Sequence, residues 1–183
     1  MKIISGKHKS RVLYTLEGLN TRPMMSRMKE SVFNTIGPYF DGDVVLDLFG
    51  GSGQLSLEAL SRGASKAYIV EKDYKASKII SDNISLLKEE NNTYLYKMDY
   101  KLALNEFANK NMKFDIIFLD PPYKLNIMEE LIDFIEKHDL LNDYGVVVCQ
   151  YVRNNFTPKE TDYLKIRKNY TYASSEVLIY DKK

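Results

Sequence analysis

The sequence predicts one α/β domain built on a mostly parallel, seven-stranded sheet with helices on both faces. From residue 44 onward, short apolar runs alternate with longer amphipathic ones. This is the pattern of parallel strands joined by helical crossovers. After residue 151 two further strand-like runs follow each other without a helix, which predicts a C-terminal antiparallel pair. At 183 residues and 44% hydrophobic, the chain can bury one core.

The first 40 residues predict an extension of this domain, a β-hairpin followed by a helix. Residues 2–5 and 11–16 flank the basic stretch 6–9, Gly-Lys-His-Lys. Ser26 is placed to cap a helix that ends near Gly37. The inward-facing positions of that helix would be Met28, Val32 and Ile36.

The core, residues 41–183, divides into elements by the periodicity of its apolar residues. The predicted strands are 44–49, 67–71, 93–98, 114–119, 146–151, 163–172 and 176–180. The predicted helices are 54–62, 74–90, 101–109 and 127–138. Parallel sheets bind ligands beyond the carboxyl ends of their strands, so we expect one site at that edge.

The charge of the chain is uneven, although its net value is only +1. Residues 1–30 hold seven Lys or Arg against two Glu, while the remainder is mildly acidic. A basic arm of this kind suits contact with phosphates, and a solvated, lysine-rich terminus is the alternative. The candidate contacts are Lys7, Lys9, Arg11, Arg22 and Arg27.

A glycine loop, residues 47–53 (Asp-Leu-Phe-Gly-Gly-Ser-Gly), follows the first strand of the core. Such glycines let the chain turn sharply into a helix and let a ligand approach the backbone. Glu71, at the end of the second strand, lies 20 residues after Gly51, where an acid would hold ribose hydroxyls. Asp47 could attract the ammonium of an amino acid and Asp99 could accept from an adenine amine, which favours S-adenosylmethionine over NAD. Alternatively, Asp47 caps the turn and Asp99 caps the next helix.

The strand 114–119 ends in Asp120, Pro121, Pro122 and Tyr123. An exocyclic base amine is a poor nucleophile, and two acceptors can hold its nitrogen pyramidal. The Asp120 side chain and the Pro121 carbonyl could supply them. The prolines fix the backbone and remove competing donors, and Tyr123 could stack on an extruded base. The alternative is that these four residues have only a structural role, as an ordinary turn after a strand.

The sequence lacks the residues that a metal site, a disulfide or a cysteine nucleophile would require. One cysteine and two distant histidines make a zinc site and a disulfide improbable, so no metal is expected. Cys149 lies within an apolar run without a nearby histidine, which predicts a core thiol rather than a nucleophile. The sequence lacks an apolar export segment and any membrane-length apolar run, which predicts a cytoplasmic protein without a membrane partner.

These motifs together resemble the RsmD family, bacterial class I S-adenosylmethionine-dependent methyltransferases of 16S ribosomal RNA. The resemblance covers nearly the whole chain. It rests on the segments 3–7, 22–23, 27–34, 47–53, 57–63 and 120–123. The chain departs from the family at Met24, Met25 and Ser26, has Gln150 where an acid is common, and has Tyr123 in place of the more usual Phe.

The resemblance implies a Rossmann-like methyltransferase fold and methylation of the N2 amine of a guanine in 16S rRNA. The substrate would be ribosomal RNA, within the small subunit or an assembly intermediate, and the protein would be a monomer. The cofactor residues would be Asp47, Phe49, Gly50, Gly51, Gly53, Glu71 and Asp99. The catalytic residues would be Asp120, Pro121, Pro122 and Tyr123. Methylation of adenine or of a protein glutamine, and a catalytically silent RNA-binding assembly factor, are the alternatives.

Overall fold

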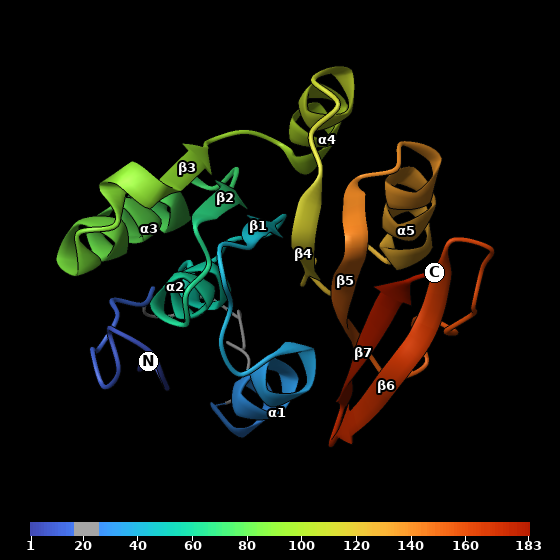
Figure 1. Cartoon of the computed structure of the whole chain (residues 1–183), viewed down its shortest axis with the longest axis horizontal. Helices are drawn as coiled ribbons and strands as arrows, with labels where there is room; N and C mark the ends of the chain where they lie inside the picture. The colour runs from blue at the N-terminus through green and yellow to red at the C-terminus, as the bar shows by residue number, and fades with distance from the viewer. Residues whose placement is uncertain (17–25) are drawn as a thin grey trace.

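The computed structural model describes residues 1–16 and 26–183 and contains the predicted seven-stranded sheet (Figure 1). The strand order is β3-β2-β1-β4-β5-β7-β6. The first five strands are parallel, β7 is antiparallel to β5, and β6 is antiparallel to β7. The α/β fold class and the C-terminal antiparallel pair are therefore confirmed.

The ends of the strands lie within two residues of the predicted ends, except for the start of β5. Their bounds are β1 Val44–Asp47, β2 Lys66–Val70, β3 Thr93–Tyr96, β4 Phe114–Leu119, β5 Leu141–Val152, β6 Leu164–Tyr172 and β7 Ser175–Lys182. β5 begins five residues earlier than predicted because Leu141 already pairs with Phe114, and the register then shifts before Ile116 pairs with Val146. The early part of β5 contains Gly145 and Tyr144, whose positive φ of 64° breaks the regular strand pattern.

Helices cover both faces of the sheet, as Figure 1 shows. Their bounds are α1 Ser26–Ile36, α2 Gln54–Ser61, α3 Tyr74–Leu87, α4 Tyr100–Asn109 and α5 Met128–Lys137. Residues of α1, α2 and α3 pack in one buried apolar cluster, and residues of α4 and α5 pack in the other. Among the residues that the structure describes, no helix has the length and apolar character that crossing a bilayer requires.

The helix predicted over 74–90 ends earlier, at Leu87. Lys88 adopts a left-handed conformation with φ 58° and closes the helix. Its neighbour Glu89 is then buried, and its carboxylate contacts the N-terminal hairpin. The overestimate arose because the polar sequence 88–90 carries no glycine or proline that would mark the end of the helix.

The N-terminal hairpin is present as a single bridge between Lys2 and Val12. The Ile3 amide donates to the Arg11 carbonyl at 3.0 Å, and the Ser10 amide donates to the Ile3 carbonyl at 2.9 Å. Ser26 was predicted to cap this helix, but α1 begins at Ser26, which is therefore the first helical residue and not the cap before it. Two of the three predicted inward positions, Met28 and Val32, are buried, and Ile36 packs against the same core.

Candidate active site

The glycine loop lies between β1 and α2, at the carboxyl edge of the sheet. Gly50 donates to the Val70 carbonyl at 2.8 Å, and a Cβ at this position would lie 2.5 Å from the Ile69 side chain. Gly51 has φ 58°, and a Cβ there would meet nothing within 4 Å. Gly53 has φ 78° and is the residue before α2. Gly50 thus fits the loop tightly against β2, while Gly51 borders open space that a ligand can enter.

Asp47 is the last residue of β1 and is almost completely buried, at 1% exposure. Burial raises the pKa of its carboxyl to about 7, although hydrogen bonds from Ser56 and the Phe49 backbone oppose this shift. The Ser56 hydroxyl donates to Oδ2 at 3.2 Å, whereas Oδ1 has no hydrogen-bond partner. A buried carboxylate oxygen without a donor suits a ligand that brings a cationic N–H group.

Asp120 lies at the end of β4, the neighbour of β1 in the sheet. In the register of these strands Asp47 pairs with Phe118, two residues before Asp120. Burial, together with the smaller effect of the nearby Asp47 charge, raises the pKa of the Asp120 carboxyl to about 7. The two predicted halves of the site, one for the cofactor and one for the amine, therefore meet across two adjacent strands.

Glu71 and Asp99 follow the next two strands along the edge, and both carboxylates accept backbone hydrogen bonds. Glu71 Oε2 accepts from the Gly51 amide at 2.9 Å, and Oε1 accepts from the Asp73 amide at 2.8 Å. Asp99 accepts from the Lys101 amide at 3.0 Å and so caps α4, which is the alternative role considered from the sequence. The Asp99 side chain is still 40% exposed and can contact a ligand.

Phe49 of the same loop is partly buried. Its ring lies 5.2 Å from the Tyr100 ring, centroid to centroid, at an interplanar angle of 45°. This contact joins the glycine loop to the start of α4. Phe49 therefore supports the wall of the candidate cofactor site from the side of β3 and α4.

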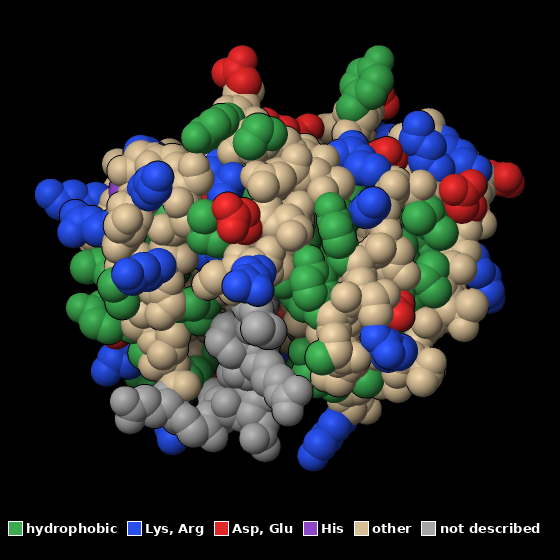
Figure 2. All heavy atoms as spheres, turned by 90° about the horizontal axis from the view of Figure 1, so that it is seen from below, with side chains coloured by type: hydrophobic (Ala, Val, Ile, Leu, Met, Phe, Trp, Pro, Cys, Tyr) green, Lys and Arg blue, Asp and Glu red, His purple; other side chains and the backbone are tan. Residues whose placement is uncertain are grey.

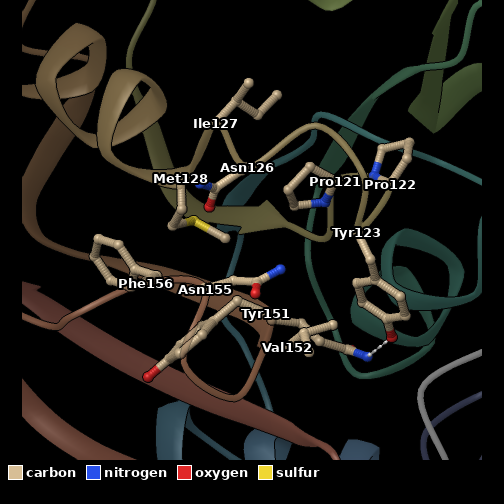
Figure 3. Close-up of a pocket in the computed structure, with 11 residues that line it drawn as sticks. Pro121, Pro122, Tyr123, Asn126, Ile127, Met128, Tyr151, Val152, Asn155 and Phe156 are labelled. Carbon is tan, nitrogen blue, oxygen red and sulfur yellow. Dashed lines mark hydrogen bonds between the residues drawn. The ribbon is translucent and has the colours of Figure 1, made fainter.

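The proline-rich tetrapeptide borders a pocket at the end of β4 and β5 (Figure 3). Pro121 is buried, Pro122 is exposed, and Tyr123 is half-buried. The Gln150 amide Nε2 donates to the Tyr123 hydroxyl at 3.2 Å, the dashed line in Figure 3. The rest of the lining, which includes Asn126, Met128, Asn155 and Phe156, was not predicted from the sequence. Asn126 and Asn155 lie in loops outside the motif, so no local signal marked them.

The residues predicted to contact RNA differ in whether their charged groups already form an ion pair within the protein. Lys9, Arg11 and Arg27 are exposed and form no ion pair with any described residue. The Lys7 ammonium instead lies 2.6 Å from Glu89 Oε1. Arg22 lies outside the described residues. Figure 2 views the side of the molecule that carries α1, and Lys and Arg side chains are spread over all of this face.

Lys29 is one of the seven Lys or Arg residues of the basic arm, but its charge is not available to RNA. Its side chain is 1% exposed and its ammonium lies 3.1 Å from Glu58 Oε2. Burial lowers the pKa of Lys29, and Glu58 opposes that shift. Glu58 also accepts from the Arg62 guanidinium at 2.8 Å and from the Ile4 amide at 2.8 Å. Lys29 therefore fastens α1 and the hairpin to α2 and cannot reach a phosphate.

Three further polar residues that the sequence analysis missed hold the hairpin in place. The Ser61 hydroxyl donates to the Ser5 carbonyl at 2.6 Å. The Asn83 amide oxygen accepts from Tyr14 N at 2.7 Å, while its NH₂ group donates to Ser52 O at 2.9 Å. Burial opposes ionisation of Glu89, but hydrogen bonds from Asn92, Lys7 and His8 outweigh it and lower its pKa. The hairpin is thus bound to α2 and α3, and through Asn83 to the glycine loop.

Residues 1–181 match the protein family described as "Conserved hypothetical protein 95". The chain belongs to this family. It is 39% identical, over the full length of both proteins, to the Bacillus subtilis protein named "Putative rRNA methyltransferase YlbH". It is 32% identical to "Ribosomal RNA small subunit methyltransferase D" of Escherichia coli strain K12, covering 86% of this chain and 78% of that protein.

A solved structure titled "Putative methyltransferase yhhF from Escherichia coli" has the same fold, with a TM-score of 0.86 at 27% identity. That likeness covers all of this chain and 98% of the other. The chain is accordingly an S-adenosylmethionine-dependent methyltransferase with the Rossmann-like class I fold. The resemblance inferred from the sequence motifs is confirmed.

The site fits this cofactor on three structural observations. Asp47 Oδ1 is a buried acceptor without a donor, as the ammonium of the methionine portion requires. The space beside Gly51 is open. Asp99 lies further along the same edge and retains an exposed carboxylate. Among the described ranges no cluster of His, Cys, Asp and Glu could hold a metal ion, and Cys149 is buried in the core with a raised pKa because of burial.

Proposed function

We propose that this protein transfers the methyl group of S-adenosylmethionine to the exocyclic N2 amine of a guanine in small-subunit ribosomal RNA. The observation that carries this proposal is the proximity of Asp47 and Asp120 at the ends of adjacent strands. Asp47 suits the cationic end of the cofactor, and Asp120 suits an amine N–H. The name of the E. coli relative specifies the ribosomal RNA of the small subunit as what that protein methylates.

Bound S-adenosylmethionine supplies a methyl group on a positively charged sulfur, which a nitrogen lone pair can attack in line. The guanine amine is a weak nucleophile because its lone pair is delocalised into the ring. Asp120 would accept one amine N–H and the Pro121 carbonyl the other, which localises the lone pair and aims it at the methyl group. Two prolines contribute no backbone N–H, so no donor of the motif competes for these oxygens.

Tyr123 would stack on the base once it has left the RNA helix. Stacking of a base on an aromatic side chain is worth about 1 to 3 kcal/mol. The Gln150 amide bonded to the Tyr123 hydroxyl would hold the ring in place. Glu71 would present its carboxylate to the ribose, and the Phe49–Tyr100 contact would close one side of the cofactor site.

The N-terminal extension, residues 1–40, would bind the RNA. Residues 41–183 would bind the cofactor and catalyse methyl transfer. Lys9, Arg11 and Arg27 have uncommitted charges, and we include Arg22 from its sequence alone. Lys7 would contribute less because it pairs with Glu89. We further propose that the protein acts as a monomer in the cytoplasm, on the small subunit or an assembly intermediate.

The experiment that tests this function uses the purified protein with methyl-labelled S-adenosylmethionine. Free rRNA and small-subunit particles that lack the modification are supplied in parallel, and the labelled nucleoside is identified by mass spectrometry. We expect N2-methylguanosine. Methylated adenosine or labelled protein would overturn the guanine assignment, and cofactor binding without any transfer would instead indicate an assembly factor.

A further inference from the structure

Gln150 carries a buried acceptor that the fold leaves without a donor. Its side chain is 3% exposed, and Oε1 has no hydrogen-bond partner. Within the described residues only two other buried side-chain atoms share this condition, Asp47 Oδ1 and Gln54 Oε1. A buried acceptor without a donor costs free energy, which a ligand N–H group can recover.

The register of the sheet brings Gln150 beside Asp120. Leu119 of β4 pairs with Cys149 of β5, so Asp120 and Gln150 occupy the next position along both chains. Phe118 and Val148, one side-chain repeat earlier, belong to the same core cluster. Side chains alternate along a strand and neighbouring strands lie about 4.8 Å apart, so continuing this register by one residue beyond the end of β4 puts Asp120 and Gln150 on the same face.

The hydrogen bond to Tyr123 determines which end of the Gln150 amide is offered to a ligand. Nε2 donates to the Tyr123 hydroxyl at 3.2 Å, which commits the NH₂ group. The carbonyl Oε1 is the end that remains. Gln150 and Tyr123 both line the pocket that begins at Pro121 (Figure 3). The arrangement therefore presents two acceptors, the Asp120 carboxylate and the Gln150 carbonyl, on neighbouring strands.

Guanine has the complementary pair of donors. Its N1–H lies directly beside its 2-amino group, whereas the ring nitrogen beside the adenine amine is an acceptor. We propose that Gln150, held by the Tyr123 hydroxyl, accepts the N1–H of the guanine whose 2-amino group binds Asp120, and thereby selects guanine. This inference rests on the proposed function and assigns the base selectivity of that site to Gln150.

The test replaces the target guanine in the RNA by 2-aminopurine, which keeps the 2-amino group but has an acceptor at N1. Single-turnover methylation is measured with saturating cofactor, on free RNA or on reconstituted particles, whichever the wild type accepts. We expect wild type to methylate guanine about 10- to 100-fold faster than 2-aminopurine, the loss typical of one buried hydrogen bond. Gln150→Leu should slow guanine methylation by a similar factor and barely affect 2-aminopurine.

Two variants separate selectivity from damage to the fold. Gln150→Glu retains an acceptor that the Tyr123 hydroxyl can bond, so the preference for guanine should survive. Tyr123→Phe keeps the ring but frees the Gln150 amide to turn its NH₂ group toward the N1 of 2-aminopurine, so the preference should shrink. Cofactor affinity, measured by calorimetry, should be unchanged in all three variants.

The outcomes distinguish this inference from the proposed function. If guanine is methylated but Gln150→Leu keeps the wild-type ratio of guanine to 2-aminopurine rates, Gln150 does not read the base and only this inference is wrong. If wild type methylates another group or none, the proposed function and the assignment of Gln150 fail together. An unchanged ratio in Tyr123→Phe would show that the hydroxyl does not hold the Gln150 amide.

Discussion

Asp120 is the residue on which the proposed chemistry depends most directly. Asp120→Ala removes an acceptor that matters most when the amine nitrogen becomes pyramidal in the transition state. We expect kcat to fall by about 10² to 10³-fold, while cofactor affinity stays close to wild type. Steady-state kinetics and calorimetry with S-adenosylmethionine measure the two quantities. Near wild-type turnover would show that Asp120 is not the amine acceptor.

Asp120→Asn asks whether the carboxylate must also take the proton. An amide oxygen can accept a hydrogen bond from the amine, but it is a far weaker base than a carboxylate. If orientation is the main role, Asp120→Asn retains much more activity than Asp120→Ala. Equal loss in the two variants would instead support proton transfer to Asp120.

Asp47 predicts an unusual dependence of stability on pH in the ligand-free protein. Its folded pKa of about 7 lies above the ordinary value of 3.8, so the folded chain keeps a proton that the unfolded chain loses. The contribution of Asp47 to the free energy of unfolding is therefore fully present below about pH 4 and is lost as the pH rises towards 7. In urea unfolding, wild type should lose stability between about pH 4 and pH 7 relative to Asp47→Asn, with little further change at higher pH.

Cofactor binding should reverse this effect, because a cationic ammonium beside Asp47 favours the carboxylate. The affinity for S-adenosylmethionine should rise with pH through about 7 in wild type and rise less in Asp47→Asn. Identical pH profiles for the two proteins would mean that Asp47 does not titrate in this range.

At the scale of elements, the N-terminal hairpin is fixed to α2 by close backbone contact. A Cβ on Gly6 would lie 1.7 Å from the Ser61 carbonyl oxygen. Gly6→Ala should therefore displace the hairpin, lower the free energy of unfolding and weaken RNA binding. Gly42→Ala is the matched control, since Gly42 has a similar φ of 90° but nothing within 4 Å of the added carbon.

The control variant should lose only about 1 to 2 kcal/mol, the cost of the left-handed conformation, with RNA affinity preserved. Urea unfolding and RNA titrations compare the two variants. Equal losses in both would show that the contact between Gly6 and Ser61 does not position the hairpin.

At the scale of the whole molecule, the free charges of the basic arm predict how binding depends on salt. Each Lys or Arg that contacts a phosphate contributes about one unit to the slope of log affinity against log salt. Lys9→Ala and Arg11→Ala should each flatten that slope by about one unit. Lys7→Ala should flatten it less, because the Lys7 ammonium already pairs with Glu89.

The salt series is measured as RNA affinity between about 50 and 200 mM salt for each variant. If Lys9→Ala and Arg11→Ala keep the wild-type slope, the RNA lies on another surface. The double variant Lys7→Ala with Lys9→Ala should then also leave the slope unchanged.

The order of the elements and the two motifs at the edge of the sheet could be predicted from the amino-acid sequence alone. Alternating apolar periodicity predicted the parallel strands, and the segments 47–53 and 120–123 predicted the cofactor and amine halves, because local composition records local structure. The ends of elements were less secure. Lys88 ends α3 in a left-handed conformation, which the presence of a lysine does not predict.

The pairs of residues that act together became clear from the folded structure. It buried Lys29 against Glu58, paired Lys7 with Glu89 and brought Gln150 beside Asp120. These partners are separated by 29, 82 and 30 positions in the chain. Their contacts come from helix packing and strand register, which depend on the whole fold, and no pattern within one segment of sequence records them.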